Sequence, residues 1–335
     1  MRSWTRAEAN RFRWDGEDTG HYESYFLRAN HPRERRALWI RYTVFAPRGD
    51  LKAARGELWF IYFDGSTGKH HAAKSIHPIA DSRFDTSAGA LDILVGSASL
   101  TDDLATGTID ATTGPVSWDL RLSSESDKDA PLLLLKEALY GTGFPKAKSL
   151  TPRPFTSFSG TLVVDGDAIA IDDWIGSQNH NWGARHTDRY SWGQVVGFDD
   201  APDVFLECAT ARLRLGSVWT PPLTTLALIE GRERTLLTGI RNIVRGSGVT
   251  TDLTWRVTAQ GSGVSVHAMF TAVSKDFVGL RYDNPPGGAK ICLNSKIARC
   301  EMVVHRAGKP RRLVSNSAAF EILADDPHPS IAVRV

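Results

Sequence analysis

The chain has 335 residues, of which 41% are hydrophobic, and its 40 basic and 38 acidic side chains give a formal net charge of only +2. This length is sufficient for one large core or two ordinary ones, because single cores rarely grow beyond about 250–300 residues. The nearly balanced charge, without basic runs interleaved with aromatic residues, argues against a nucleic-acid partner.

The N-terminal segment has no apolar stretch of the length of a signal peptide. The longest apolar cluster, PLLLLKEALYG at 131–141, is too short to cross a bilayer. We therefore expect a cytoplasmic protein without an integral membrane segment. The spacing of Cys208, Cys292 and Cys300 matches neither a disulfide scaffold nor a zinc cluster, so reduced thiols are expected.

From Tyr22 onward, short runs with two-residue alternation are separated by Gly, Asp, Asn and Pro, which is typical of antiparallel sheet. The predicted strands lie at 23–28, 37–45, 57–63, 90–95, 107–110, 116–123, 156–166, 190–198, 204–215, 224–229, 251–259, 263–273 and 301–306. One short helix is predicted over Pro131 to Tyr140, with proline in the first turn and glycines after it.

Many strands at short spacing and few helices predict an all-β protein built from barrels or sandwiches. About eight strands precede the predicted helix, the number at which an antiparallel barrel holds one small ligand. A second series of strands begins near Tyr190. We place a domain boundary around Gly183, giving domains at 1–183 and 184–335.

The stretch at 175–194, IGSQNHNWGARHTDRYSWGQ, is dense in polar and aromatic residues. On a strand, alternation separates Gln178, His180, Trp182 and the preceding Trp174 from Asn179 and Asn181. On the facing strand, the same rule groups Tyr190, Trp192 and Gln194. An aromatic wall with a few polar groups typically lines a pocket for an apolar ligand, and we expect the His180 set to face it. Cross-strand pairs and a turn at NHNWG are the structural alternative.

Two carboxylates share a strand face with apolar residues, Glu23 in HYESYFLRA and Glu207 in VFLECATARL. A buried carboxylate either finds a partner or has its pKa raised, and a carboxyl group that stays protonated is a usable general acid. For Glu23 the favoured interpretation is a structural ion pair with a strand arginine such as Arg41 or Arg212. For Glu207 both interpretations stay open.

Tyr282 and Asp283 end a strand before a proline and glycine turn, where they are either turn formers or a proton source at a barrel mouth. His71 and His77 are separated by roughly 20 Å along a strand, too far for one metal ion. The sequence has no phosphate-binding loop, nucleotide signature or G-x-S-x-G motif. We expect no metal and no cofactor.

The stretch 175–198, together with GHYESYFLRANHP at 20–32, ALWIRYT at 37–43 and CLNSKIA at 292–298, resembles the lipocalin-like superfamily of carotenoid 1,2-hydratase, tocopherol cyclase and the AttH-like proteins. The resemblance covers most of the chain in order and is strongest at HNWG. It implies two lipocalin-like antiparallel β-barrels packed side by side, in agreement with the strand pattern.

Members of that superfamily protonate an alkene in a hydrophobic substrate and then add water or an internal hydroxyl, and related proteins assist pericyclic cyclisations. The hydratase pattern of a histidine two residues before a tryptophan matches His180 and Trp182. Its later Tyr-x-Asp has no counterpart, because Tyr282 and Asp283 are adjacent.

Two functions are therefore predicted. The first is a cofactor-independent hydratase, cyclase or isomerase that acts by proton transfer on an isoprenoid or polyketide-like substrate. The second is a non-catalytic carrier of an apolar small molecule, because fold does not imply function. A weaker third is a domain whose dense motif only holds two barrels together. For the enzyme, the predicted catalytic residues are His180, Glu207 and Tyr190, and the predicted substrate-binding residues are Gln178, Asn181, Trp182, His186, Trp192, Gln194, Tyr282 and Asp283.

Overall fold

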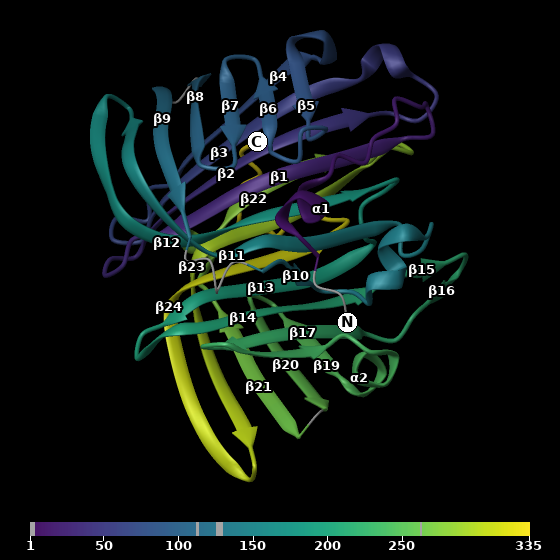
Figure 1. Ribbon diagram of the computed structural model, residues 1–335, viewed down its shortest axis with the longest axis vertical. Coiled ribbons are helices and arrows are strands. Elements are labelled where there is room, and N and C mark those ends of the chain that lie inside the picture. The colour runs from purple at the N-terminus through teal and green to yellow at the C-terminus, as the bar shows by residue number, and fades with distance from the viewer. Residues whose placement is uncertain (1–3, 112–113, 125–129, 262) are drawn as a thin grey trace.

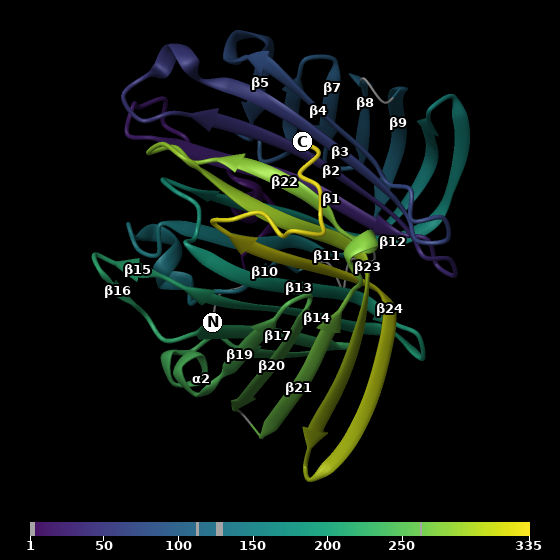
Figure 2. The same ribbon diagram turned by 180° about the vertical axis from the view of Figure 1, so that it is seen from behind.

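A computed structural model describes residues 4–111, 114–124, 130–261 and 263–335. The described chain is all-β, with two large antiparallel sheets and only short helices, as predicted. The N-terminal sheet is uppermost in Figure 1 and the C-terminal sheet lies below it, and Figure 2 shows the same arrangement from behind.

The first sheet has 12 strands over the described residues and curls into a nearly closed barrel, in which β4 comes back into contact with β8. Its strand order is β4-β3-β2-β1-β12-β11-β9-β8-β7-β6-β5, with β10 paired to β11. The strands are β1 His21–Asn30, β2 Arg36–Ala46, β3 Arg55–Asp64, β4 His71–Pro78, β5 Ser82–Asp85, β6 Asp92–Val95, β7 Ala98–Thr101, β8 Leu104–Ala111, β9 Gly114–Ser123, β10 Leu132–Leu133, β11 Ala147–Val164 and β12 Asp167–Gly183.

The second sheet has 10 strands over the same described ranges, in the order β18-β17-β14-β13-β24-β23-β21-β20-β19, with β22 paired to β23. Its strands are β13 Arg189–Phe198, β14 Ala201–Arg212, β17 Leu223–Glu230, β18 Glu233–Leu237, β19 Ser247–Thr251, β20 Thr254–Gly261, β21 Val264–Thr271, β22 Val278–Asp283, β23 Ala289–Arg306 and β24 Lys309–Ala324. A separate pair consists of β15 Arg214–Leu215 and β16 Val218–Trp219. The first sheet thus ends at Gly183 and the second begins at Arg189, on either side of the predicted boundary, which stays a prediction.

The helix predicted over Pro131 to Tyr140 is wrong in most of its length. Leu132 and Leu133 pair with β11, and only a 3-10 turn, η3 at Glu137–Gly141, follows them. The physical reason is burial, because the apolar side chains of this run line a space between the two sheets. A helix would instead gather them on one of its faces. The other helical elements are α1 Arg6–Asn10, α2 Ile240–Arg245, η1 Leu51–Ala53, η2 Ile79–Asp81 and η4 Ser274–Asp276.

Three apolar clusters correspond to three layers of packing. One fills the curl of the first sheet around Leu27 and Phe60, and one fills the second around Trp255 and Phe270. The third lies between the sheets and joins side chains such as Trp39 of the first to others of the second. Burial of apolar surface on this scale stabilises the pair of sheets as one body.

Gly193 shows how β13 packs against the core of the second sheet with one face while its other face points toward the first sheet. A Cβ atom here would lie 2.5 Å from the Phe270 ring, so only glycine lets this strand pack closely on the second core. Because strand side chains alternate, the neighbouring Trp192 and Gln194 then face the first sheet.

Within the described ranges, no helix is long and apolar enough to span a membrane.

Candidate active site between the two sheets

A cavity of about 260 Å³ lies between the two sheets. Its volume is close to the lower end of the roughly 300–1,000 Å³ typical of small-molecule pockets. Most of its wall is apolar and comes from distant segments, including Phe26, Leu134, Leu139, Ala209 and Leu223. Leu139 of η3, Ile243 of α2 and Phe144, which is 52% exposed, also line the cavity, so its outer end lies near these segments.

At its inner end the cavity adjoins a polar chamber of about 40 Å³. The two spaces share Tyr22, Phe26, Asn181, Tyr190 and Glu321 among their lining residues. The chamber has room for one water molecule or one small polar group, since a water needs about 10–15 Å³ of such space. Thr187 also lines both spaces, and the residues that line the chamber alone are Trp39, Arg41, His186 and Tyr282.

Strand register assembles the floor of the cavity from the second sheet. Across β17, β14, β13, β24 and β23, one row of directly opposed residues is Thr225, Ala209, Trp192, Glu321 and Asn294. Opposed residues in antiparallel strands have neighbouring side chains on one face. The register therefore places one carboxylate, Glu321, between an indole and an amide on the face toward the first sheet.

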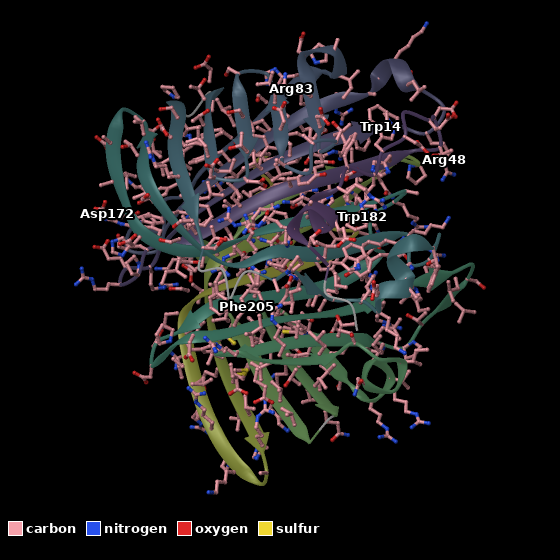
Figure 3. The ribbon with its side chains drawn as sticks, viewed as in Figure 1. Trp14, Arg48, Arg83, Asp172, Trp182 and Phe205 are labelled. Atoms are coloured by element: carbon pink, nitrogen blue, oxygen red, sulfur yellow. The ribbon has the colours of Figure 1, made fainter. Side chains whose placement is uncertain are left out.

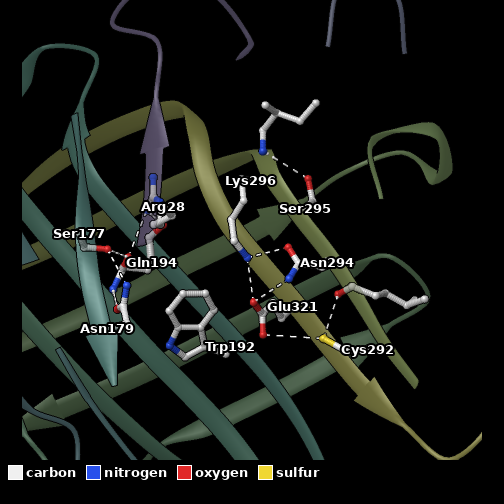
Figure 4. Close-up of polar contacts among 12 residues, drawn as sticks. Arg28, Ser177, Asn179, Trp192, Gln194, Cys292, Asn294, Ser295, Lys296 and Glu321 are labelled. Atoms are coloured by element: carbon white, nitrogen blue, oxygen red, sulfur yellow. Dashed lines mark hydrogen bonds and ion pairs between the residues drawn. The ribbon is translucent and has the colours of Figure 1, made fainter. Parts of the chain in front are cut away.

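Glu321 is held by a network of hydrogen bonds (Figure 4). Its Oε1 accepts from Lys296 Nζ at 2.8 Å and from Asn294 Nδ2 at 3.1 Å. Its Oε2 accepts from the Tyr190 hydroxyl at 3.1 Å. The Lys296 side chain is fully buried, so this ion pair is shielded from solvent. The carboxylate is thus fixed in place with one edge on the cavity.

The three tyrosines of the chamber are neutral donors at physiological pH. Burial raises the pKa of Tyr190 and of Tyr282 well above the ordinary value of 10. Burial also raises the pKa of Tyr22, against the opposing effect of the Arg41 charge. Each phenol therefore keeps its proton and can donate one hydrogen bond.

His186 is a neutral ring with a defined tautomer. Burial, and next the positive charge of Arg41, lower its pKa to about 3. Its Nε2 lies 3.1 Å from the Asp283 carbonyl oxygen, which can only accept, so Nε2 carries the hydrogen. The ring also packs against Tyr22, with centroids 4.0 Å apart. Nδ1 is left as a hydrogen-bond acceptor in the wall of the chamber.

The predicted parity of β12 is confirmed, but the expected side of the strand does not line the cavity. Asn181 lines both spaces, whereas none of Gln178, His180 and Trp182 lines either of them. The His180 side faces the first sheet's own interior and the N-terminal segment instead. Trp182 belongs to one apolar cluster with Ala9, and Figure 3 shows its label next to helix α1.

His180 belongs to a filled cluster. Its Nδ1 lies 2.7 Å from the Ala9 carbonyl oxygen and its Nε2 lies 2.8 Å from Glu23 Oε1, so both ring nitrogens have a partner. Its ring stacks on Tyr25 at 4.2 Å. Although burial raises the pKa of Glu23, hydrogen bonds from His180 and His21 lower it to about 2. These contacts fit the favoured interpretation of Glu23 as a structural carboxylate, but its side-chain partners are two histidines and the Tyr25 hydroxyl, and not an arginine.

Glu207 is buried behind the cavity wall. Its Oε2 accepts from Thr151 at 2.7 Å and its Oε1 accepts from the indole Nε1 of Trp192 at 3.0 Å. Burial raises its pKa to about 7. Trp192 lines the cavity but Glu207 does not, so the indole separates this carboxyl group from a ligand.

Gln194 shares a face with Tyr190 and Trp192 as predicted, and it bonds to β12 across the gap between the sheets. It donates to Asn179 Oδ1 at 2.8 Å and accepts from Ser177 Oγ at 2.7 Å (Figure 4). The structural alternative, cross-strand pairs between these two strands, is wrong, because β12 pairs with β1 and β11 while β13 pairs with β14 and β24. The motif therefore bridges two sheets instead of forming one hairpin.

Tyr282 and Asp283 have separate positions. Tyr282 lines the chamber, but the Asp283 carboxylate lies 2.7 Å from Arg55 Nη2 in a partly exposed ion pair and lines neither space. Only the backbone carbonyl of Asp283 reaches the site, through His186. Of the predicted site residues, the structure brings together Asn181, His186, Tyr190, Trp192 and Tyr282.

Sequence reasoning missed Glu321, Lys296 and Tyr22 as site residues, and it treated Arg41 only as an ion-pair candidate. A signal was present for Glu321, which is the one carboxylate in the apolar run AAFEILA, as Glu207 is in its own strand. CLNSKIA also alternates Cys292, Asn294 and Lys296 onto one face.

No model of a protein family matches the sequence, and no curated protein matches it. Solved structures do match in shape. The AttH protein of Nitrosomonas europaea is 13% identical and matches 91% of this chain and 92% of its own, with a TM-score of 0.58. CghA is 10% identical over 92% of this chain and 90% of its own, with a TM-score of 0.63. Kievitone hydratase from Nectria haematococca is 12% identical over 92% and 89%, with a TM-score of 0.55.

This chain has the fold of these proteins. The predicted resemblance to AttH-like proteins and to a hydratase is thereby confirmed at the level of the fold. One of the matching proteins is a hydratase by name, and CghA is also solved with the small molecule Sch210972, at 11% identity and a TM-score of 0.62 to this chain.

Proposed function

We propose that this protein is a cofactor-independent enzyme that binds an apolar small molecule between its two sheets and converts it by proton transfer. The observation that carries the proposal is a mostly apolar cavity next to a small polar chamber, with Glu321 and Tyr190 lining both spaces and His186 lining the chamber. An isoprenoid or polyketide-like molecule would place its bulk in the apolar part. Hydration, cyclisation and isomerisation are the reactions that such a site supports.

Glu321 takes the role of proton acceptor because its carboxylate borders the cavity and is held in place by Lys296 and Asn294. A general base must lie within hydrogen-bond reach of the proton that it removes. Tyr190 is the neighbouring neutral donor, and Asn181 and Trp192 position the substrate. His180 and Glu207 were the predicted proton donors, but they lie outside the lining and are assigned no direct contact with substrate.

The test is to incubate the purified protein with a lipid extract of its host and follow by mass spectrometry what binds and what is converted over time. Wild type should convert a bound compound, whereas Glu321→Gln and Tyr190→Phe should bind it but convert it at least about 100-fold more slowly, as expected for loss of acid–base catalysis. Glu301→Gln, which changes an exposed carboxylate on β23, is the matched control and should behave as wild type.

A bound compound that wild type releases unchanged would identify a carrier and reject the enzyme. If no apolar compound of the extract binds to wild type, the proposed binding function is rejected as well.

A further inference from the structure

Arg41 is a buried cation in the wall of the polar chamber. Its side chain extends from β2 and the residue is 4% exposed. Its Nε donates to Thr43 Oγ1 at 3.1 Å and its Nη2 donates to Ser24 Oγ at 2.7 Å. Its guanidinium lies over the Tyr282 ring, 4.5 Å from the centroid.

These contacts leave Arg41 without a compensating anion in direct contact. A guanidinium has five N–H donors, and only two of them donate to hydroxyl groups of described residues. No carboxylate of the described chain forms an ion pair with it, whereas the buried ammonium of Lys296 is paired with Glu321. A buried charge without a partner is costly, so such groups are normally paired or bind a ligand.

The charges around the chamber therefore sum to one excess positive charge. Arg41 and Glu321 line the chamber, and the Glu321 carboxylate is already paired with Lys296, which lies outside the lining, so the Arg41 charge is left over. His186 is uncharged because its pKa is lowered to about 3 by burial and by the Arg41 charge. The tyrosines keep their protons, since burial raises the pKa of each of them. The chamber is a small, positively charged space beside an apolar cavity.

We propose that Arg41 binds an anionic oxygen, either a carboxylate or the enolate of a 1,3-dicarbonyl group, at one end of an otherwise apolar ligand. A guanidinium matches such oxygens with two parallel N–H donors. The chamber of about 40 Å³ accommodates the head group, and the adjoining space of about 260 Å³ accommodates the apolar tail. The inference rests on the proposed function, because it names the substrate class of the same site.

The experiment compares probes with the same ten-carbon chain and different head groups. Binding of decanoate, 1-decanol and decylamine to the full chain is measured by titration calorimetry at pH 7.5, with 2-decanoylcyclohexane-1,3-dione as the enolate probe. Wild type should bind decanoate or the enolate at least tenfold more tightly than 1-decanol, and decylamine most weakly. The two anionic probes distinguish a carboxylate from an enolate as the preferred group.

Arg41→Gln should abolish the preference for the anion while 1-decanol binds as before. Arg55→Gln is the matched control, because Arg55 lies in a partly exposed ion pair outside the lining, and it should keep the preference. The order of affinities in wild type tests the inference even if Arg41→Gln fails to fold.

Equal binding of decanoate, enolate and 1-decanol by wild type would overturn the role of Arg41 and leave the proposed function intact. Failure of all four probes to bind would instead count against the apolar binding function itself. Retention of the anion preference by folded Arg41→Gln would also overturn the inference.

Discussion

Glu23 and Glu321 are both buried carboxylates with several hydrogen-bond donors, but their surroundings differ. Glu23 accepts from His180, His21 and two backbone N–H groups of the N-terminal segment, which covers it. Glu321 accepts from Lys296, Asn294 and Tyr190, and the cavity lies beside it. A buried carboxylate that accepts several hydrogen bonds is thus part of a closed structural cluster in one sheet and of an accessible site in the other.

The difference originates in a covering segment. The short helix α1 begins with a capping box, in which Glu8 N donates to Thr5 Oγ1 and Thr5 N donates to Glu8 Oε2. This fixes α1 so that Ala9 and Asn10 fill the space next to His180. No described segment fills the corresponding space beside Glu321. Polar density in a motif therefore indicates a buried cluster, while the packing of a distant segment determines whether that cluster is open.

The largest expected effect is on the closed cluster. His180→Ala should lower the free energy of unfolding by about 3–5 kcal/mol, because it leaves the buried Glu23 carboxylate without its closest side-chain partner. Urea unfolding at pH 7 measures the loss. The exposed His267→Ala is the control and should change stability by less than about 0.5 kcal/mol.

The folded fraction of His180→Ala should bind decanoate as wild type does, because His180 does not line the cavity. A stability loss below about 1 kcal/mol together with a large loss of affinity for decanoate would contradict the structural role of His180 and show that it takes part in ligand binding.

The second prediction uses the opposite pKa shifts of the two glutamates that were singled out in the sequence. Burial raises the pKa of Glu207 from 4.5 to about 7, so the folded state binds its proton more tightly than the unfolded state. Stability from this group is present below pH 4.5 and is lost as the pH rises toward 7. With about 1.4 kcal/mol for each pH unit, the loss is about 3 kcal/mol.

Glu207→Gln should remove this pH dependence, so that the variant gains on wild type between pH 5 and 8 in urea unfolding. Glu23 has the opposite sign: the hydrogen bonds that lower its pKa to about 2 stabilise the fold above pH 4.5 and are lost below it. Glu23→Gln should accordingly be most destabilised at neutral pH and approach wild type near pH 2. Parallel curves for wild type and Glu207→Gln would show that Glu207 is ionised at neutral pH.

Much of the architecture could be predicted from the sequence, because alternation and turn residues are local signals. The all-β class, the parity of Gln178, His180 and Trp182 against Asn181, and the shared face of Tyr190 and Trp192 all follow from the two-residue period of a strand. The prediction of a helix over Pro131 to Tyr140 was wrong because a short apolar run can form either a helix or an extended segment, and its tertiary contacts decide between them.

The open face of the motif could not be predicted in the same way. It depends on α1, about 170 residues before His180 in the chain, and on strand pairings that bring Glu321 next to Trp192. Long-range register of this kind leaves no local pattern. Arg41 illustrates the point, since its environment combines Ser24, Thr43 and Tyr282 from three strands.

The smallest expected effect is on the open site. Ala209→Leu adds a larger apolar side chain to the cavity floor beside Trp192, where a ligand would lie. The change should lower the affinity for decanoate at least tenfold, about 1.4 kcal/mol, because ligand and side chain cannot occupy the same space. Stability should stay within about 1 kcal/mol of wild type or rise slightly, because the added group fills existing space and does not overpack a core. Ala53→Leu, on the exposed turn η1, is the matched control and should leave affinity unchanged. If Ala209→Leu binds decanoate as tightly as wild type, the ligand lies elsewhere. The cavity beside Glu321 would then not be the binding site, and the contrast with Glu23 would have no functional meaning.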